Sequence, residues 1–181
     1  TINKDLNSGE IEIKIDEGSE EVLMRGPYVM LGYYNDPVTT NNTIKNGWLH
    51  TGDKGKIDDD GHLYITGRVK DTFKTSKGEF IDPAKIEALF GEVEYFGQMC
   101  VVGLGIPQPI MLVNTSDIGK KLTKNELIKK LENKLSSVNS KVFNYLKVST
   151  IVICNDEWTP QNEILTPTMK IKRGNIDKMY M

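Results

Sequence analysis

The chain has 181 residues, of which 38% are hydrophobic and 27% charged, and its formal net charge is -2. A chain of this length can bury one core or two small ones, because domains usually span about 50–250 residues. The composition excludes the basic excess that attracts nucleic acid, and no apolar run approaches the roughly 20 residues that a membrane-spanning helix needs.

The first part of the chain has the pattern of a β meander. Residues 9–15 alternate apolar and charged side chains, which is the period of a half-buried strand. Residues 21–24 and 28–31 continue the meander in short pieces, and the sequence from Gly32 to Pro37 predicts an aromatic core followed by a turn. A further hairpin is expected around the acidic turn at 58–61, because Asp-Gly between two apolar runs is a strong hairpin signal.

The stretch from Thr66 to Glu87 carries the strongest turn and helix-start signals in the chain. It contains the pair Gly67-Arg68, an alternating charged and apolar run, a glycine turn at Gly78 and a helix start at Asp82-Pro83. Such signals predict a joint between two folded bodies, followed by a hairpin and the first helix of a new unit. We expect a partial β subdomain over residues 1–67 and a second domain over residues 68–181.

The second domain mixes helix and strand signals. Asp82-Pro83 opens a helix that ends at Gly91 and carries Ile86, Leu89 and Phe90 on one face. Thr123 to Glu126 has the spacing of a capping box for a helix with an apolar stripe of Leu127, Ile128, Leu131, Leu135 and Val138. Buried strands are expected at 98–102 and 110–113, and a third strand at 148–154. These elements predict the α+β class, with a hairpin and a three-stranded sheet flanked by helices.

The two cysteines, Cys100 and Cys154, lie inside apolar strand-like runs, where a thiol acts as a small hydrophobic group. Two cysteines form neither a disulfide framework nor a metal site, so we expect no metal ligands and a reducing, cytoplasmic compartment. Nothing near Thr1 has the basic-then-apolar pattern of a signal segment. Because the chain begins at Thr1 with strand-like sequence close behind, we expect a fragment of a longer protein.

Four motifs, in this order, resemble the adenylate-forming enzymes, which include acyl-CoA synthetases, firefly luciferase and the adenylation domains of peptide synthetases. They are Gly32 to Pro37, Thr51-Gly52-Asp53, the joint with Gly67-Arg68-Val69-Lys70-Asp71, Gly78, Pro83 and Glu87, and residues 164–173. The sequence Leu165-Thr166-Pro167-Thr168-Met169-Lys170 is most similar to long-chain fatty acyl-CoA synthetases. Many other members of the family have glycine before that lysine.

The resemblance implies roles for five residues. Asp53 would accept both ribose hydroxyls of ATP, with Arg68 on the ribose or phosphates beside it. Lys170 would contact the substrate carboxylate and the α-phosphate in the first half-reaction. Lys70 would be the hinge of a mobile C-terminal domain, and the Gly78 loop would serve thioester formation.

Three of these roles have a simpler alternative in the sequence. Asp53 on its own spacing is an ordinary turn aspartate, and Arg68 could pair with Asp71 across the turn. Lys170 on its own is a surface lysine on a proline-stiffened loop.

By resemblance, the intact protein is an ATP-dependent ligase of fatty acid metabolism that forms acyl-adenylate and then acyl-CoA. It would use ATP, Mg²⁺ and CoA, together with a fatty acid and the missing N-terminal domain of the same chain. A peripheral membrane contact and a homo-oligomer stay open. Because the family's phosphate loop and its adenine and magnesium motif are absent from this sequence, we expect the chain alone to be inactive and to hold no cofactor tightly.

Two other functions are kept as alternatives. One is an adenylation enzyme that loads a carrier protein, which shares both half-reactions and changes the acceptor. The other is a stand-alone binding module without catalysis, which would be favoured by decay of Asp53, Arg68 or Lys170, and all three are intact.

Overall fold

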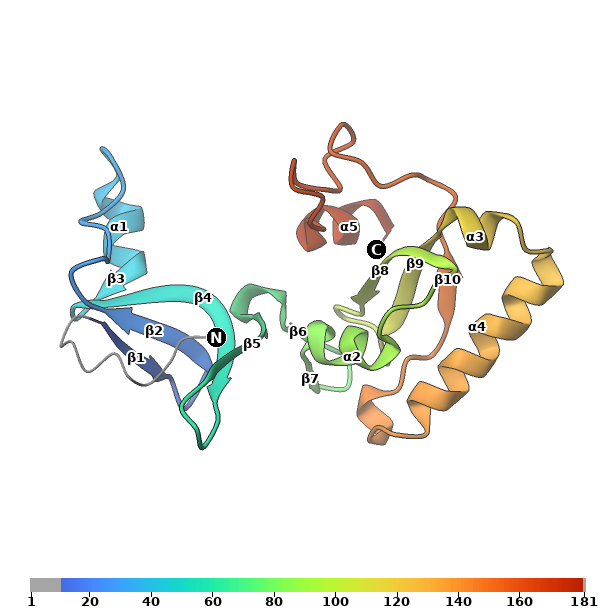
Figure 1. The fold of residues 1–181 in the computed structure, drawn as a ribbon, viewed down its shortest axis with the longest axis horizontal. Coiled ribbons are helices and arrows are strands. Elements are labelled where there is room, and N and C mark those ends of the chain that lie inside the picture. The colour runs from blue at the N-terminus through green and yellow to red at the C-terminus, as the bar shows by residue number, and fades with distance from the viewer. Residues whose placement is uncertain (1–10, 181) are drawn as a thin grey trace. The chain divides into compact units, whose positions relative to one another are not determined.

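The structure, a computed structural model, describes residues 11–180 and divides the chain into two compact units, Thr1–Lys70 and Asp71–Met181 (Figure 1). Residues 9 and 10 of the first predicted strand lie outside the described residues. Within residues 11–180 no helix is both long and apolar enough to cross a membrane.

Unit 1 is built on a twisted antiparallel sheet (Figure 1). Its strands are β1 (Glu12–Ile15), β2 (Glu21–Arg25), β3 (Ile44–Lys45), β4 (Trp48–Ile57) and β5 (Leu63–Arg68). The order is β1-β2-β4-β3, and β5 pairs with β4 through the predicted acidic turn. Val22 and Leu23 of β2 are buried. The meander at β1 and β2 and the hairpin of β4 and β5 are confirmed, whereas the predicted piece at residues 28–31 is not a strand.

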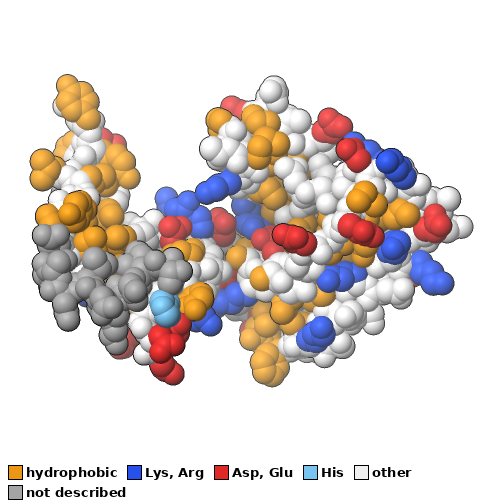
Figure 2. All heavy atoms as spheres, viewed as in Figure 1, with side chains coloured by type: hydrophobic (Ala, Val, Ile, Leu, Met, Phe, Trp, Pro, Cys, Tyr) orange, Lys and Arg blue, Asp and Glu red, His pale blue; other side chains and the backbone are white. Residues whose placement is uncertain are grey.

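The segment from Tyr28 to Pro37 differs from the prediction, because it forms neither a strand nor an aromatic core. Turns lead into helix α1 (Pro37–Thr43), whose first N–H groups are capped by Asp36 Oδ1, 2.9 Å from the Thr39 nitrogen. Asp followed by Pro is a helix start, and this local signal prevails over the aromatic pattern. Tyr28 and Tyr34 are 75% and 94% exposed. Figure 2 shows apolar side chains gathered over this part of unit 1.

Unit 2 is an α+β domain. The short 3₁₀ helix η1 (Val69–Asp71) spans the boundary between the units. Unit 2 then begins with the hairpin β6 (Phe73–Lys74) and β7 (Phe80–Ile81) and helix α2 (Pro83–Phe90). Next come β8 (Phe96–Val102), β9 (Ile110–Thr115), α3 (Asp117–Lys120), α4 (Lys124–Asn139), η2 (Asn144–Leu146), β10 (Ile151–Ile153) and α5 (Arg173–Tyr180). The sheet order is β10-β9-β8, with β8 antiparallel and β10 parallel to β9.

The two larger of three buried clusters make up most of the core of unit 2. One packs α2 and α4 on the sheet through residues such as Ile86, Phe90 and Val138. The other joins the sheet to α5 through residues such as Cys100, Leu165 and Ile176. These layers confirm the predicted α+β class.

Several details of unit 2 correct the prediction. Leu89 is 45% and Ile128 38% exposed, so the buried faces of α2 and α4 are narrower than their apolar stripes. The third strand is shorter than predicted, and Cys154 lies just after it. The capping box between Thr123 and Glu126 is confirmed. Helices α3 and α5 were not predicted.

Candidate functional site

The Thr51-Gly52-Asp53 motif lies inside β4, directly opposite the end of β5. Asp53 pairs with Arg68 in the strand register, and Arg68 Nε lies 3.0 Å from Asp53 Oδ1. The alternative in which Arg68 pairs with Asp71 is therefore wrong. A carboxylate offers about four acceptor positions, so the bond from Arg68 leaves Asp53 able to accept hydroxyl donors.

Strand β2 holds this motif in place through Glu21. Its Oε1 accepts the Gly52 N–H at 2.8 Å, and its Oε2 lies 2.8 Å from His50 Nδ1. Thr51 Oγ1 donates to the Val22 carbonyl at 2.8 Å and accepts the Asp53 N–H at 3.1 Å. Gly52 has φ of 75°, a backbone conformation that residues with a side chain rarely adopt. Sequence analysis missed Glu21, since only the pairing of β2 with β4 brings it to the motif.

Lys70 is exposed and is the last residue of unit 1. The Gly78 loop follows as the closed tip of the β6–β7 hairpin. Gly78 has φ of 89° and donates its N–H to the Thr75 carbonyl at 3.0 Å. The Ser76 N–H donates to the Ile106 carbonyl at 3.0 Å, which docks the tip on the turn between β8 and β9. The predicted hairpin is confirmed, and it is a fixed loop within unit 2.

Lys170 lies at the end of a small closed loop. Leu165 and Ile171 form an antiparallel bridge, and the Thr166 N–H donates to the Lys170 carbonyl at 2.8 Å. Inside the loop, the Lys170 N–H donates to Thr166 Oγ1 at 3.0 Å. Met169 has φ of 63°, which explains why glycine is well suited to the position before the lysine. Lys170 is exposed, while the base of the loop at Leu165 is fully buried.

Just after this loop, Arg173 opens α5 and binds several segments of unit 2. Its Nη2 contacts both carboxylate oxygens of Glu87 in α2, at 2.9 and 3.1 Å. Its Nη1 donates to the Val101 carbonyl of β8 at 2.6 Å and to Cys100 Sγ at 2.9 Å, and Nε lies 3.5 Å from Asp71 Oδ2. Burial raises the pKa of the Glu87 carboxyl, and the positive charge of Arg173 opposes that rise.

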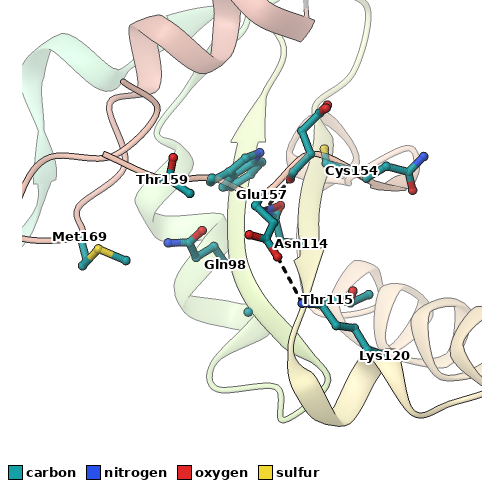
Figure 3. A pocket seen from close by; sticks show the side chains of 12 residues that line it. Gln98, Asn114, Thr115, Lys120, Cys154, Glu157, Thr159 and Met169 are labelled. Carbon is teal, nitrogen blue, oxygen red and sulfur yellow. Dashed lines mark hydrogen bonds and ion pairs between the residues drawn. The ribbon is translucent and has the colours of Figure 1, made fainter. Parts of the chain in front are cut away.

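A cavity of about 310 Å³ lies beside the lysine loop, and Met169 forms part of its wall (Figure 3). Gln98 and Asn114 of the sheet line it, and Lys120 pairs with Glu157 at 3.5 Å. Asn114 Nδ2 donates to the Asp156 carbonyl at 3.1 Å. The cavity therefore has a mixed lining, in which these polar side chains lie beside Cys154, Trp158 and Met169.

Asp58, Asp60 and His62 bring potential metal-ligating atoms within 4.8 Å of one another at the β4–β5 turn, which the sequence analysis did not predict. Asp58 already accepts the His62 N–H at 2.8 Å and lies 3.3 Å from its Nδ1. A turn with these internal bonds accounts for the cluster without an ion.

Of the five predicted site residues, Asp53 and Arg68 are brought together in unit 1. Gly78 and Lys170 belong to unit 2, on two separate loops.

Comparison with known proteins identifies the family of this chain. Residues 70–181 match the family model described as "AMP-binding enzyme C-terminal domain". The chain is 33% identical over 178 residues to fatty acyl-CoA synthetase B of Dictyostelium discoideum, covering 88% of this chain and 26% of that protein. It is also 33% identical over 182 residues to "Long chain acyl-CoA synthetase 6, peroxisomal" of Arabidopsis thaliana, again covering 88% of this chain and 26% of the relative. The chain thus spans about a quarter of the length of these relatives.

The fold is similar to the adenylation domain of a carboxylate reductase from Mycobacterium chelonae. The TM-score is 0.78 at 21% sequence identity, covering 93% of this chain and 29% of that structure.

Proposed function

We propose, from the premise that this chain belongs to the AMP-binding, adenylate-forming enzyme family, that it is the C-terminal part of a long-chain fatty acyl-CoA synthetase. Residues 1–67 would end the large AMP-binding domain, and residues 68–181 would be its mobile small domain. The observation that carries the proposal is the closed loop that presents Lys170, because it lies within the matched C-terminal domain and the curated relatives reported above are acyl-CoA synthetases.

In the first half-reaction, a fatty acid carboxylate attacks the α-phosphorus of ATP. A P–O bond forms, pyrophosphate leaves and acyl-adenylate remains. Two anions approach each other in this step while negative charge grows around the α-phosphorus. Lys170 is exposed on a loop closed by the Leu165–Ile171 bridge, so its ammonium is a suitable donor for that charge. One such preorganised donor is worth about 3–4 kcal/mol in the transition state.

Asp53 and Arg68 would hold the ribose end of the nucleotide. The Asp53 carboxylate is 39% exposed in its side chain and fixed by Arg68 and by the backbone that Glu21 supports. Hydrogen bonds from two ribose hydroxyls to one carboxylate are charge-assisted and therefore strong.

Lys70 would allow unit 2 to adopt two orientations, since it is the last residue before that unit. One orientation would present Lys170 for adenylation. The other would present the Gly78 hairpin while the CoA sulfur attacks the acyl carbonyl carbon and AMP leaves. Domain rotations of this kind commonly gate turnover.

Mg²⁺ would neutralise phosphate charge in the intact enzyme. The cluster of Asp58, Asp60 and His62 does not fit it, because Mg²⁺ requires octahedral oxygen ligands and Asp58 is bonded to His62. We therefore assign Mg²⁺ to none of the described residues. The chain alone is expected to be inactive, because its sequence lacks the family's phosphate loop and its adenine and magnesium motif.

A cytoplasmic location is part of the proposal and is tested by imaging the tagged full-length protein. Its support is the pair of buried free cysteines.

The simplest test of the proposal is which acceptor, CoA or a carrier protein, the enzyme uses in the second half-reaction. The full-length protein is incubated with ATP, Mg²⁺ and palmitate, and then with either CoA or a purified carrier protein. Palmitoyl-CoA is the expected product. Preference for the carrier protein would favour the carrier-loading alternative, and absence of product with both acceptors would favour a non-catalytic module.

A further inference from the structure

The function proposed above gives no role to Arg173, a largely buried cation. Arg173 is only 13% exposed in its side chain, and it lies three positions after the catalytic candidate Lys170. Arginine carries five N–H donors in one rigid plane, so contacts at more than one of its nitrogens fix the direction of the guanidinium. Here one end of the guanidinium meets both oxygens of Glu87 and the other reaches the Val101 carbonyl.

Glu87 is itself held on the sheet. Its Oε1 accepts the Val101 N–H at 2.7 Å, so α2, β8 and α5 meet at one pair of side chains. Arg173 therefore has little freedom to move relative to β8.

This anchor lies close in sequence to the lysine loop. The Lys172 N–H donates to the Ile164 carbonyl at 2.8 Å, and Leu165 is fully buried at the other end of the loop. Only Ile171 and Lys172 separate Arg173 from Lys170, so the anchored arginine and the lysine loop share one short hydrogen-bonded segment.

Arg173 also reaches the start of unit 2. Asp71 follows the proposed hinge residue Lys70, and its Oδ2 lies 3.5 Å from Arg173 Nε, an ion pair without a hydrogen bond. The same guanidinium thus joins the segment leaving the hinge to the segment that carries the lysine.

We propose that Arg173 is a positioning residue for Lys170, which locks the lysine loop to α2, β8 and the hinge end so that rotation at Lys70 carries the loop as part of a rigid unit. This inference rests on the proposed function of Lys170 in adenylation.

The test is a double-mutant cycle in the full-length enzyme, with palmitate-dependent ATP–pyrophosphate exchange as the readout. Arg173→Met is expected to reduce exchange by about a hundredfold, the size expected for a misplacement of about 1 Å at a reacting group. In the Lys170→Ala background it should cause no further loss, because there is no longer an ammonium to position. Arg173→Lys, which keeps the charge and loses the two-pronged contact, should be intermediate.

An equal loss in both backgrounds would overturn the inference alone, since a general loss of folding does not depend on Lys170. If Lys170→Ala left exchange unchanged, the proposed role of Lys170 would fail and this inference with it.

A second variant distinguishes loss of positioning from misfolding. Arg173→Met with Glu87→Gln removes both charges and keeps a side-chain oxygen that can accept the Val101 N–H. We expect this protein to melt above Arg173→Met and below the wild type, because the Val101 carbonyl has lost its donor. It should stay as defective in exchange as Arg173→Met. Recovery of exchange in the folded double variant would contradict the positioning role.

Discussion

Replacing Arg173 by methionine in the purified 181-residue chain should destabilise unit 2 by about 3 kcal/mol. Removing one partner of a buried ion pair costs about 3–5 kcal/mol, because the remaining charge stays desolvated. The lower end of this energy range applies here, since the side chains of Arg173 and Glu87 are still 13% and 18% exposed. Glu87 also retains its hydrogen bond from the Val101 N–H. At 1.4 kcal/mol per factor of ten, the unfolding constant should rise by about a hundredfold.

The assay is urea unfolding followed by the fluorescence of Trp158, which is 3% exposed in the core of unit 2. A Trp48→Phe background removes the tryptophan of unit 1. Lys120→Met is the matched control, because Lys120 and Glu157 form a pair that is 55% and 80% exposed and should be worth less than about 1 kcal/mol.

The destabilisation should also depend on pH in a defined direction. Burial raises the pKa of Glu87, and loss of Arg173 removes the charge that opposes the rise. An acid whose folded pKa is raised destabilises the fold increasingly as pH rises through that pKa. The difference between wild type and Arg173→Met should therefore be smaller near pH 4 than near pH 7. Equal effects of Arg173→Met and Lys120→Met, or a larger difference at low pH, would refute the reasoning.

Two further predictions concern the glycine of the nucleotide motif and the cysteines. Gly52→Ala places a side chain at φ of 75° and 3.4 Å from Arg68 Nη2; a loss of about 1–2 kcal/mol of stability is expected from the backbone alone. AMP binding by the full-length protein, measured by calorimetry, should weaken as well, and unchanged stability and affinity would contradict the assignment. Burial raises the pKa of Cys100 to about 12, so its thiol should resist alkylation in the native chain at pH 8 and react once the chain is unfolded. Because this folded pKa is raised, any stability that Cys100 contributes is present below pH 9 and is lost as pH rises toward 12. Rapid native labelling of Cys100, detected by mass spectrometry, would show that the site opens.

Local signals predicted much of the fold. The alternation at residues 12–15, the Asp-Gly turn before β5 and the capping box of α4 each depend on neighbours in sequence, and each is confirmed. The segment from Tyr28 to Pro37 was predicted wrongly because its aromatic residues have strand propensity. In the structure that propensity yields to an Asp-Pro helix start, and Tyr34 remains exposed.

The interactions around the candidate site were less accessible from sequence. Motif order located Asp53, Arg68 and Lys170, but the contacts that hold them join distant residues. Glu21 reaches Gly52 only through the pairing of β2 with β4, and Arg173 reaches Glu87 only when α5 packs on the sheet. No local period predicts either contact, since each depends on how whole elements pack.

The most direct test of the proposed function is Lys170→Ala in the full-length enzyme, with Lys129→Ala on the exposed face of α4 as control. Each half-reaction is measured separately, by palmitate-dependent ATP–pyrophosphate exchange and by thioester formation from supplied palmitoyl-adenylate and CoA. Loss of one transition-state donor predicts a fall of about a hundredfold or more in exchange. Thioester formation should change far less, and the control should resemble the wild type in both. Equal loss of both half-reactions in Lys170→Ala, or no loss of exchange, would contradict the account.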